Sequence, residues 1–277
     1  MGRKKKTLSD TVETEVLQTE HSVADEANAD AAETKSLSSQ VEKTRTRQKS
    51  YLMDLRIHSP ASLGYLGIEG LDTAPALVRL ARVKGLDVIA VTDFYTGTFI
   101  DRVMAAAKDS NLTVIPGTVI RCAIPGCSDV VLSCLFPEQH SGDHIEKFLG
   151  ALGVPKNAAG NRSYLVQRQL REIVTIIEQF NGVALPSRMD KTPSRLSAIP
   201  SLVETYGFRA FDLAYPDSAR FFKTRWPKIK FQLFSFSNAN ALAQVGSRVA
   251  NVRMPLGGFE GIRQLIARQA VSGQTSL

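Results

Sequence analysis

Short apolar segments alternate along this chain with segments that carry apolar residues at helical spacing. Residues 87–92 (DVIAVT) are almost continuously apolar, which is typical of a strand covered on both faces. Residues 73–84 place their apolar side chains on one helical face and are followed by Gly85, a common helix stop. Repetition of this strand–helix unit predicts an α/β fold with a mainly parallel sheet that closes into a barrel.

The other expected elements continue the pattern. Further strands are expected at 51–57, 112–115, 182–185, 210–214, 231–234 and 250–253. Residues 119–122 and 129–136 flank Pro125-Gly126 and predict a hairpin. Further helices are expected at 99–110, 143–152 (with Asp143 as its cap), 164–180, 193–206 and 259–271.

Composition divides the chain into a tail and one folded domain. Residues 1–47 are rich in Thr, Ser, Ala, Glu and Asp and poor in large apolar side chains, which predicts disorder. This tail is either an electrostatic segment that competes for an anionic partner or a solvated leader. Residues 48–277 are long enough to bury one substantial core.

The sequence shows no targeting signal, and this observation, together with the cysteine count, predicts a cytoplasmic protein. The longest apolar runs are far shorter than a membrane span, and no apolar core follows the basic residues near the start. We therefore expect no membrane partner. The three cysteines, Cys122, Cys127 and Cys134, form no even-numbered framework, which favours free thiols in a reducing compartment.

Five polar motifs follow the expected strands in order. The first two are DLRIHS at 54–59 and TDF at 92–94. The others are VIPGTVIRC at 114–122, NGVALPSRM at 181–189 and FSFSNANALAQVG at 234–246. Together they resemble the strand-end signatures DLHxHS, TDH, GxE, AHP and SDAH of the polymerase and histidinol phosphatase (PHP) superfamily, across roughly residues 50–251. The resemblance implies a distorted (β/α) barrel and a phosphoesterase-like site.

The ligand positions of that family are mostly occupied by other residue types here. The resemblance implies up to three metals held by His, Asp and Glu at the strand ends. Of the first two imidazoles, one becomes Arg56 and one remains as His58. Asp54 and Asp93, which carry the backbone pattern of the first two motifs, are retained. The other matching positions carry Gly64, Phe94, Val119, Val131, Arg188, Asn238 and Asn240. A divalent cation needs several converging anionic or imidazole ligands, so we expect no cofactor.

These departures predict the fold of the family without its metal-dependent chemistry. We therefore expect a non-catalytic binding or regulatory module, with a phosphate-containing ligand, a nucleic acid or a protein as its partner. The main alternative is a metal-dependent phosphoesterase acting on nucleotides or nucleic acid. In that case His58, Asp54 and Asp93 hold zinc, manganese or iron, and His58 and Asp93 are the catalytic candidates. Whether the protein is an enzyme stays open, with the inactive form favoured.

Two arginines at former ligand positions suggest a pocket for an anion. Arg56 and Arg188, with Arg121 beside the missing Glu, supply fixed positive charge without activating water. Asn238 and Asn240 complete this anion-binding set. In the alternative, Arg56 and Arg188 pair with Asp54, Asp93 or Asp190 and fill an abandoned cavity.

Two further segments have both a functional and a structural interpretation. His140 and His144 have metal-compatible spacing, but a surface helix start explains them more simply. Residues 220–230 mix Phe221, Phe222 and Trp226 with five basic residues. This segment is either a nucleic-acid stacking surface, as in a basic accessory protein, or an amphipathic helix with its aromatic residues in the core.

Overall fold

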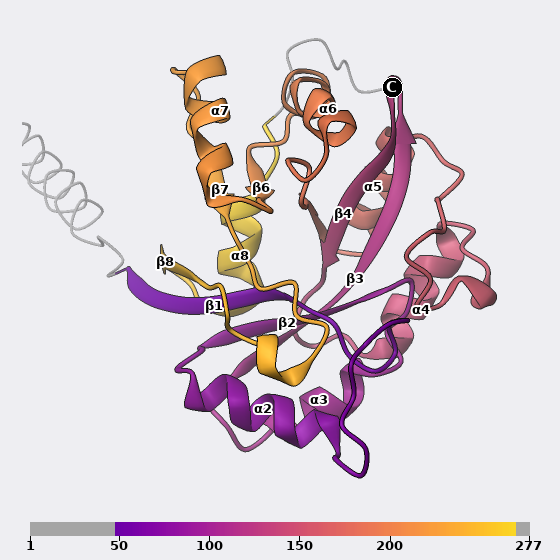
Figure 1. The fold of residues 1–277 in the computed structure, drawn as a ribbon, viewed down its shortest axis with the longest axis vertical. Coiled ribbons are helices and arrows are strands. Elements are labelled where there is room, and N and C mark those ends of the chain that lie inside the picture. Colours follow the sequence, from indigo (N-terminus) through magenta and orange to yellow (C-terminus); the bar gives the residue numbers. More distant parts are fainter. Residues whose placement is uncertain (1–47, 270–277) are drawn as a thin grey trace, which may run out of the picture. The chain divides into compact units, whose positions relative to one another are not determined.

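The structure is a computed structural model that describes residues 48–269 (Figure 1). Its main sheet has six strands in the order β5-β4-β3-β2-β1-β8. These strands are β1 (Lys49–Ile57), β2 (Val88–Phe94), β3 (Thr113–Ile124), β4 (Cys127–Leu135), β5 (Val183–Pro186) and β8 (Ala250–Met254). A second, two-stranded sheet contains β6 (Ala210–Asp212) and β7 (Gln232–Phe234).

The connections between strands supply the helices. They are α2 (Thr73–Val83), α3 (Ile100–Ala107), α4 (Gly142–Ala151), α5 (Leu170–Gln179), α6 (Pro193–Glu204), α7 (Ala219–Arg225) and α8 (Gly258–Ile266). Three short 3-10 turns, η1 (Lys156–Ala158), η2 (Pro216–Ser218) and η3 (Leu242–Gln244), lie in the loops. Among the described residues, no helix combines the length and the apolar character needed to cross a membrane.

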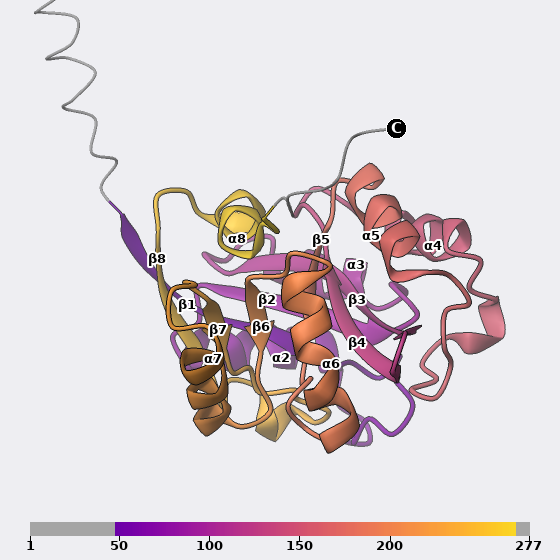
Figure 2. The same ribbon diagram turned by 90° about the horizontal axis from the view of Figure 1, so that it is seen from above.

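The strand pairing corrects the prediction of a mainly parallel, closed sheet. The β1–β2, β2–β3 and β6–β7 pairs are parallel, whereas β1–β8, β3–β4 and β4–β5 are antiparallel. The main sheet curls into a half-barrel (Figures 1 and 2). Isolated parallel bridges link Ile57, at the end of β1, to Ala239, and Ser187, after β5, to Asp212 of β6. The fold is therefore a mixed α/β half-barrel.

The side chains of the central strands alternate between two core clusters. On β2, Val88 and Ala90 face one cluster, which also takes Phe259 and Ile262 of α8. Ile89 and Val91 belong to the other, larger cluster, which is covered by α2, α3, α4, α5 and α6. Since strand side chains alternate with period two, this arrangement explains the continuous apolar run of β2, which is buried at every position.

Two predicted boundaries are wrong, for identifiable reasons. The expected separate strands 112–115 and 119–122 are one strand, β3, which continues through Pro116-Gly117 and pairs there with both neighbours. A side chain at Gly117 would lie 2.8 Å from the Cys134 carbonyl oxygen, so glycine permits the close approach of β4. The helix expected from residue 164 begins only at Leu170. The preceding residues are held instead by Val166, whose N–H donates to the Arg121 carbonyl at 2.8 Å.

Smaller differences occur at the boundaries of α4 and α8. Asp143 does not cap α4; it lies in the first turn and pairs with Lys147, while the N-cap position is Ser141. Helix α8 ends at Ile266, before the expected end of the last helix. The predicted tail (1–47) and residues 270–277 lie outside the described part of the chain.

Candidate functional site

A basic cavity of about 250 Å³ lies where several strands of the half-barrel end. Arg56 and His58 come from the end of β1, Phe94 ends β2, Arg188 follows β5 and Asn238 follows β7. We call this cavity the arginine pocket. Its lining residues are Arg56, His58, Phe94, Arg121, Val131, Arg162, Ser163, Arg188, Lys191, Arg195 and Asn238. Six of these side chains are cationic types, and none is a carboxylate.

Arg56 forms part of the pocket floor and is bonded to neutral partners. It is 3% exposed. Its Nε donates to Asn238 Oδ1 at 2.6 Å, and its Nη1 donates to Ser133 Oγ at 3.0 Å. Burial lowers the pKa of Arg56 to about 10, opposed by the nearby Asp212 charge. The guanidinium therefore remains charged at neutral pH with no carboxylate bonded to it in the described structure.

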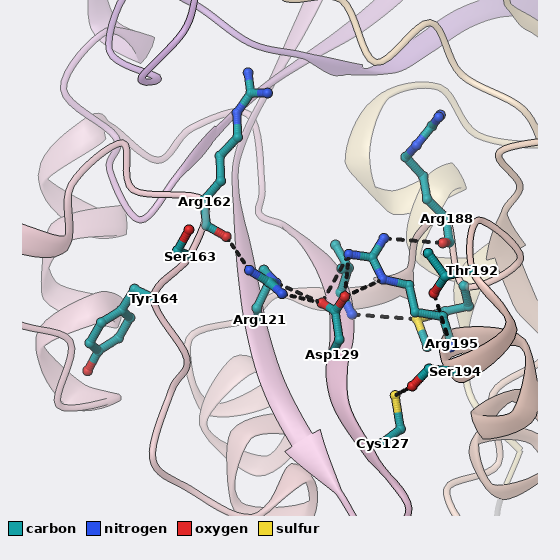
Figure 3. Close-up of polar contacts among 12 residues, drawn as sticks. Arg121, Cys127, Asp129, Arg162, Ser163, Tyr164, Arg188, Thr192, Ser194 and Arg195 are labelled. Atoms are coloured by element: carbon teal, nitrogen blue, oxygen red, sulfur yellow. Dashed lines mark hydrogen bonds and ion pairs between the residues drawn. The ribbon is translucent and has the colours of Figure 1, made fainter.

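Arg121 and Arg195 are held in place by one shared carboxylate, Asp129 (Figure 3). Arg121 Nε and Nη2 lie 2.8 and 2.6 Å from Asp129 Oδ1. Arg195 contacts both oxygens of Asp129, with Nε 2.9 Å from Oδ2 and Nη2 3.0 Å from Oδ1. All three side chains are partly buried, so these contacts fix the two guanidinium groups and offset part of their charge.

Arg162, Arg188 and Lys191 differ, because their charged groups have no hydrogen bond or ion pair to any described residue. In Figure 3 the side chains of Arg162 and Arg188 extend away from Asp129. Arg188 Nη1 is buried yet unpartnered within residues 48–269, and its backbone is left-handed (φ 54°). Burial lowers the pKa of Arg188, and burial with nearby arginines lowers the pKa of Lys191.

Asp54 and Asp93 hold loops. Asp54 accepts backbone N–H bonds from Gly246 (3.0 Å), Ser237 (3.2 Å) and Arg56 (3.4 Å). Asp93 is 1% exposed and accepts from the Ser59 N–H (2.7 Å), the Ser59 hydroxyl (2.5 Å) and the Ser62 hydroxyl (2.7 Å). Burial raises the pKa of both carboxyl groups, and these bonds oppose the rise.

The expected pairing of Arg56 or Arg188 with Asp54, Asp93 or Asp190 is not formed among the described residues. Asp190 is occupied by the backbone N–H groups of Ala214 (2.7 Å) and Tyr215 (2.9 Å). The two arginines therefore do not close the pocket by binding these three carboxylates.

His58 is a buried neutral imidazole. Its ring stacks on Phe94 with a centroid distance of 5.3 Å and an interplanar angle of 18°. Burial, with the charges of Arg56 and Arg162, lowers the pKa of His58 to about 3. Its Nδ1 has no hydrogen-bond partner in the described part of the chain. Across residues 48–269, no three His, Cys, Asp or Glu side chains gather as a metal site.

The sequence located part of this pocket. Four of the five expected anion-binding residues, Arg56, Arg121, Arg188 and Asn238, line it, but Asn240 is not among the lining residues. Instead, the Asn240 N–H donates to Gln244 Oε1 at 2.9 Å. Arg162, Lys191 and Arg195 were missed. The spacing of Arg188, Lys191 and Arg195 at the start of α6 was a usable signal.

The aromatic and imidazole rings of the other two candidate segments pack against neighbouring side chains. His140 and His144 stack on each other at 3.6 Å, and the ring of His144 also contacts Phe136 and Phe180. Near α7, the rings of Phe221, Phe222 and Trp226 pack on one another and against the core. The nearby Arg220, Lys223, Arg225, Lys228 and Lys230 are exposed. This segment presents cations at the surface, while its aromatic rings pack inward.

No protein-family model matches the chain, and no curated protein matches it. Similar solved structures do exist. One is the lesion-specific endonuclease Q of Pyrococcus furiosus, with a TM-score of 0.59, 17% identity, and coverage of 79% of this chain and 56% of that one. Another is endonuclease Q in complex with a 27-mer duplex substrate carrying an abasic lesion (TM-score 0.53, 15% identity, coverage 78% and 56%).

A third similar structure is an amidohydrolase from Chromobacterium violaceum with bound sulfate and no metal (TM-score 0.52, 13% identity, coverage 80% and 99%). At these identities the likeness shows a shared fold, which supports the fold expected from the strand-end motifs. The match spans little more than half of the endonuclease chains.

Proposed function

We propose that this chain is a PHP-like binding or regulatory module that holds a phosphate-type anion in the arginine pocket without a metal and without hydrolysing it. One observation carries the proposal: Arg188 presents a buried guanidinium nitrogen that has no partner within residues 48–269. A buried charged donor without a partner is costly, and a bound anion would supply the missing acceptor.

The composition of the pocket favours an anion over other ligands. Guanidinium groups match the oxygens of phosphate or sulfate in a planar, bidentate way, and charge-assisted bonds are the strong ones. Arg162, Arg188 and Lys191 remain available for such bonds, while Asn238 and Asp129 hold Arg56, Arg121 and Arg195 in position. The similar amidohydrolase structure contains a bound sulfate, an oxyanion of the same shape as phosphate.

The residues do not fit a divalent metal. The oxygens of Asp54 and Asp93 already accept three hydrogen bonds each, mostly from loop groups. The Phe94 ring stacks on His58, the one imidazole retained, and the arginines would repel a cation. We therefore propose no hydrolytic step, and we treat the metal site of the family as degenerate in this chain.

The second candidate is a metal-dependent phosphoesterase acting on nucleotides or nucleic acid, with zinc, manganese or iron as the ion. The observation that favours it is the likeness in fold to a lesion-specific endonuclease, one structure of which contains a DNA duplex. A nucleic-acid accessory role is a weaker variant, supported by the exposed cations around α7.

Metal content and hydrolysis separate these candidates. The full chain is purified from cells grown with added zinc, manganese and iron, and its metals are measured by elemental analysis. We expect far less than one ion per chain and background hydrolysis of a chromogenic phosphodiester, with and without chelator. Two or three ions per chain together with chelator-sensitive hydrolysis would overturn the proposal and favour the phosphoesterase.

A further inference from the structure

The arginine pocket has a closed end and an open end. Arg56, His58, Phe94 and Val131 are buried, with exposed fractions of 7% or less, and form the floor. Arg162, Ser163 and Lys191 are exposed and form the rim. A ligand group that reaches Arg56 must therefore enter from the rim, and everything attached to it must leave the same way.

The charge of the pocket exceeds what a single negative charge would balance. The charged groups of Arg162, Arg188 and Lys191 each lack a described partner. Among the described residues, the Arg56 side chain bonds only to an amide and a hydroxyl. Asp129 offsets part of the charge of Arg121 and Arg195. Asp212 is buried near Arg56 and Arg188 and offsets another part. More than one positive charge remains for a ligand to meet.

Within residues 48–269, the pocket offers no free apolar surface for a base. The apolar residues among those that line it are Phe94 and Val131, and both are buried in the floor. The Phe94 ring already stacks on His58, and the Arg162 guanidinium lies 5.8 Å from its centroid. Its volume of about 250 Å³ is also below the roughly 300–1,000 Å³ of common small-molecule sites. The pocket is therefore shaped for a compact polar group.

Building on the anion-binding function proposed above, we infer that the arginine pocket selects a terminal phosphomonoester over a phosphodiester. A phosphomonoester carries a charge of about −1.5 to −2 at pH 7 and presents three free oxygens with a single substituent. A phosphodiester carries one charge, and both of its substituents would have to pass the same rim. A free nucleotide and the phosphorylated end of a nucleic acid offer the same group.

A matched pair of nucleotides tests this selectivity. Binding of inorganic phosphate, 5′-AMP and 3′,5′-cyclic AMP to the full chain is measured by calorimetry in the presence of chelator. The two nucleotides share the base and the ribose and differ in whether the phosphate is a monoester or a diester. We expect 5′-AMP to bind at least tenfold more tightly than cyclic AMP, and inorganic phosphate to bind as well.

Variants and oligonucleotides assign the effect to the pocket. Arg188→Gln should remove most of the difference between the two nucleotides, whereas Arg79→Gln, an exposed arginine on α2, should preserve it. A 5′-phosphorylated oligonucleotide that binds more tightly than its 5′-hydroxyl counterpart would extend the ligand class to nucleic-acid ends. If only 5′-AMP shows the preference, the class is free nucleotides.

The outcomes separate this inference from the function on which it rests. Equal affinity for 5′-AMP and cyclic AMP, with phosphate still bound, would overturn the selectivity and leave the anion-binding function intact. No binding of phosphate or of either nucleotide would overturn both. A preference for 5′-AMP that survives Arg188→Gln would also overturn the inference, because the discriminating site would then lie elsewhere.

Discussion

Two groups of charged residues lie at strand ends of the half-barrel, and they differ in how their polar atoms are satisfied. Asp54 and Asp93, on β1 and β2, each accept three hydrogen bonds. All the donors lie in neighbouring loops except the N–H of Arg56, which is on β1. Arg188, which follows β5, has a buried guanidinium nitrogen that donates a hydrogen bond to no described residue. The resemblance implies a metal-binding imidazole at the position of Arg188, whereas Asp54 and Asp93 belong to the retained pattern of the first two motifs. In the described structure the carboxylates hold loops, whereas Arg188 has a donor available to a ligand.

The largest effect is expected at the carboxylates. Asp93→Ala should lower the free energy of unfolding by roughly 3 kcal/mol or more, because it leaves three buried donors without an acceptor. Urea denaturation in chelator measures this loss, with Asp109→Ala, an exposed carboxylate, as the control. Unchanged or increased stability would mean that Asp93 does not act as a loop anchor.

A pH-dependent effect is expected at Asp212, which is buried near Arg56 and Arg188. Burial raises the pKa of Asp212 to about 6, and its Oδ2 has no partner among residues 48–269. The folded protein therefore holds this proton more tightly than the unfolded chain, so its contribution to stability falls as pH rises from about 4 to 6.

Asp212→Asn should remove that dependence. The variant should match the parent near pH 4 and exceed it at pH 7 by about 3 kcal/mol, the free energy equivalent to the shift in pKa. Urea unfolding at several pH values measures the difference. A difference that stays constant across this range would show that Asp212 does not titrate as its burial implies.

On the arginine side, Arg188→Gln should affect binding more than stability. It removes one charge-assisted contact, so we expect the affinity for phosphate to fall about tenfold or more. The melting temperature without ligand should hold or rise, because a buried unpartnered donor is removed. Arg79→Gln serves as the charge-matched control. Equal binding by both variants would remove Arg188 from the site.

The smallest effect is expected at Asp129, which lies between Arg121 and Arg195. Asp129→Asn leaves the volume of the side chain nearly unchanged and frees both guanidinium groups from their shared carboxylate. The affinity for phosphate should rise several-fold, with a stability change of about 1 kcal/mol or less, because these pairs are partly exposed. Titration calorimetry measures the first change and urea unfolding the second. Weaker binding would show that Asp129 mainly orients the two arginines.

The sequence was informative where local pattern determines structure. Apolar periodicity located β1, β2 and α2, and the strand-end motifs placed Arg56 and Arg188 in one pocket. It failed where tertiary contacts override local pattern. The start of α5 shifts because Val166 bonds to β3, and β3 passes through Pro116-Gly117 because β4 packs closely there.

The missed pocket residues show the same limit. Arg162 reaches the pocket from a loop, and that loop is placed by long-range contacts such as the Gly160 N–H bond to the Phe94 carbonyl at 2.7 Å. Likewise, the role of Asp93 depends on hydroxyl groups 31 and 34 residues away in the sequence. No local pattern reports whether a buried carboxylate faces a metal or a loop.

Titration of the full chain with inorganic phosphate in chelator tests the central claim most directly. We expect saturable heat for one site per chain, and the same affinity when the titration is repeated with manganese or zinc in place of the chelator. The opposite result, no heat in chelator and binding only after a metal is added, would contradict it. In that case the carboxylates, and not the arginines, would be the functional side of the half-barrel.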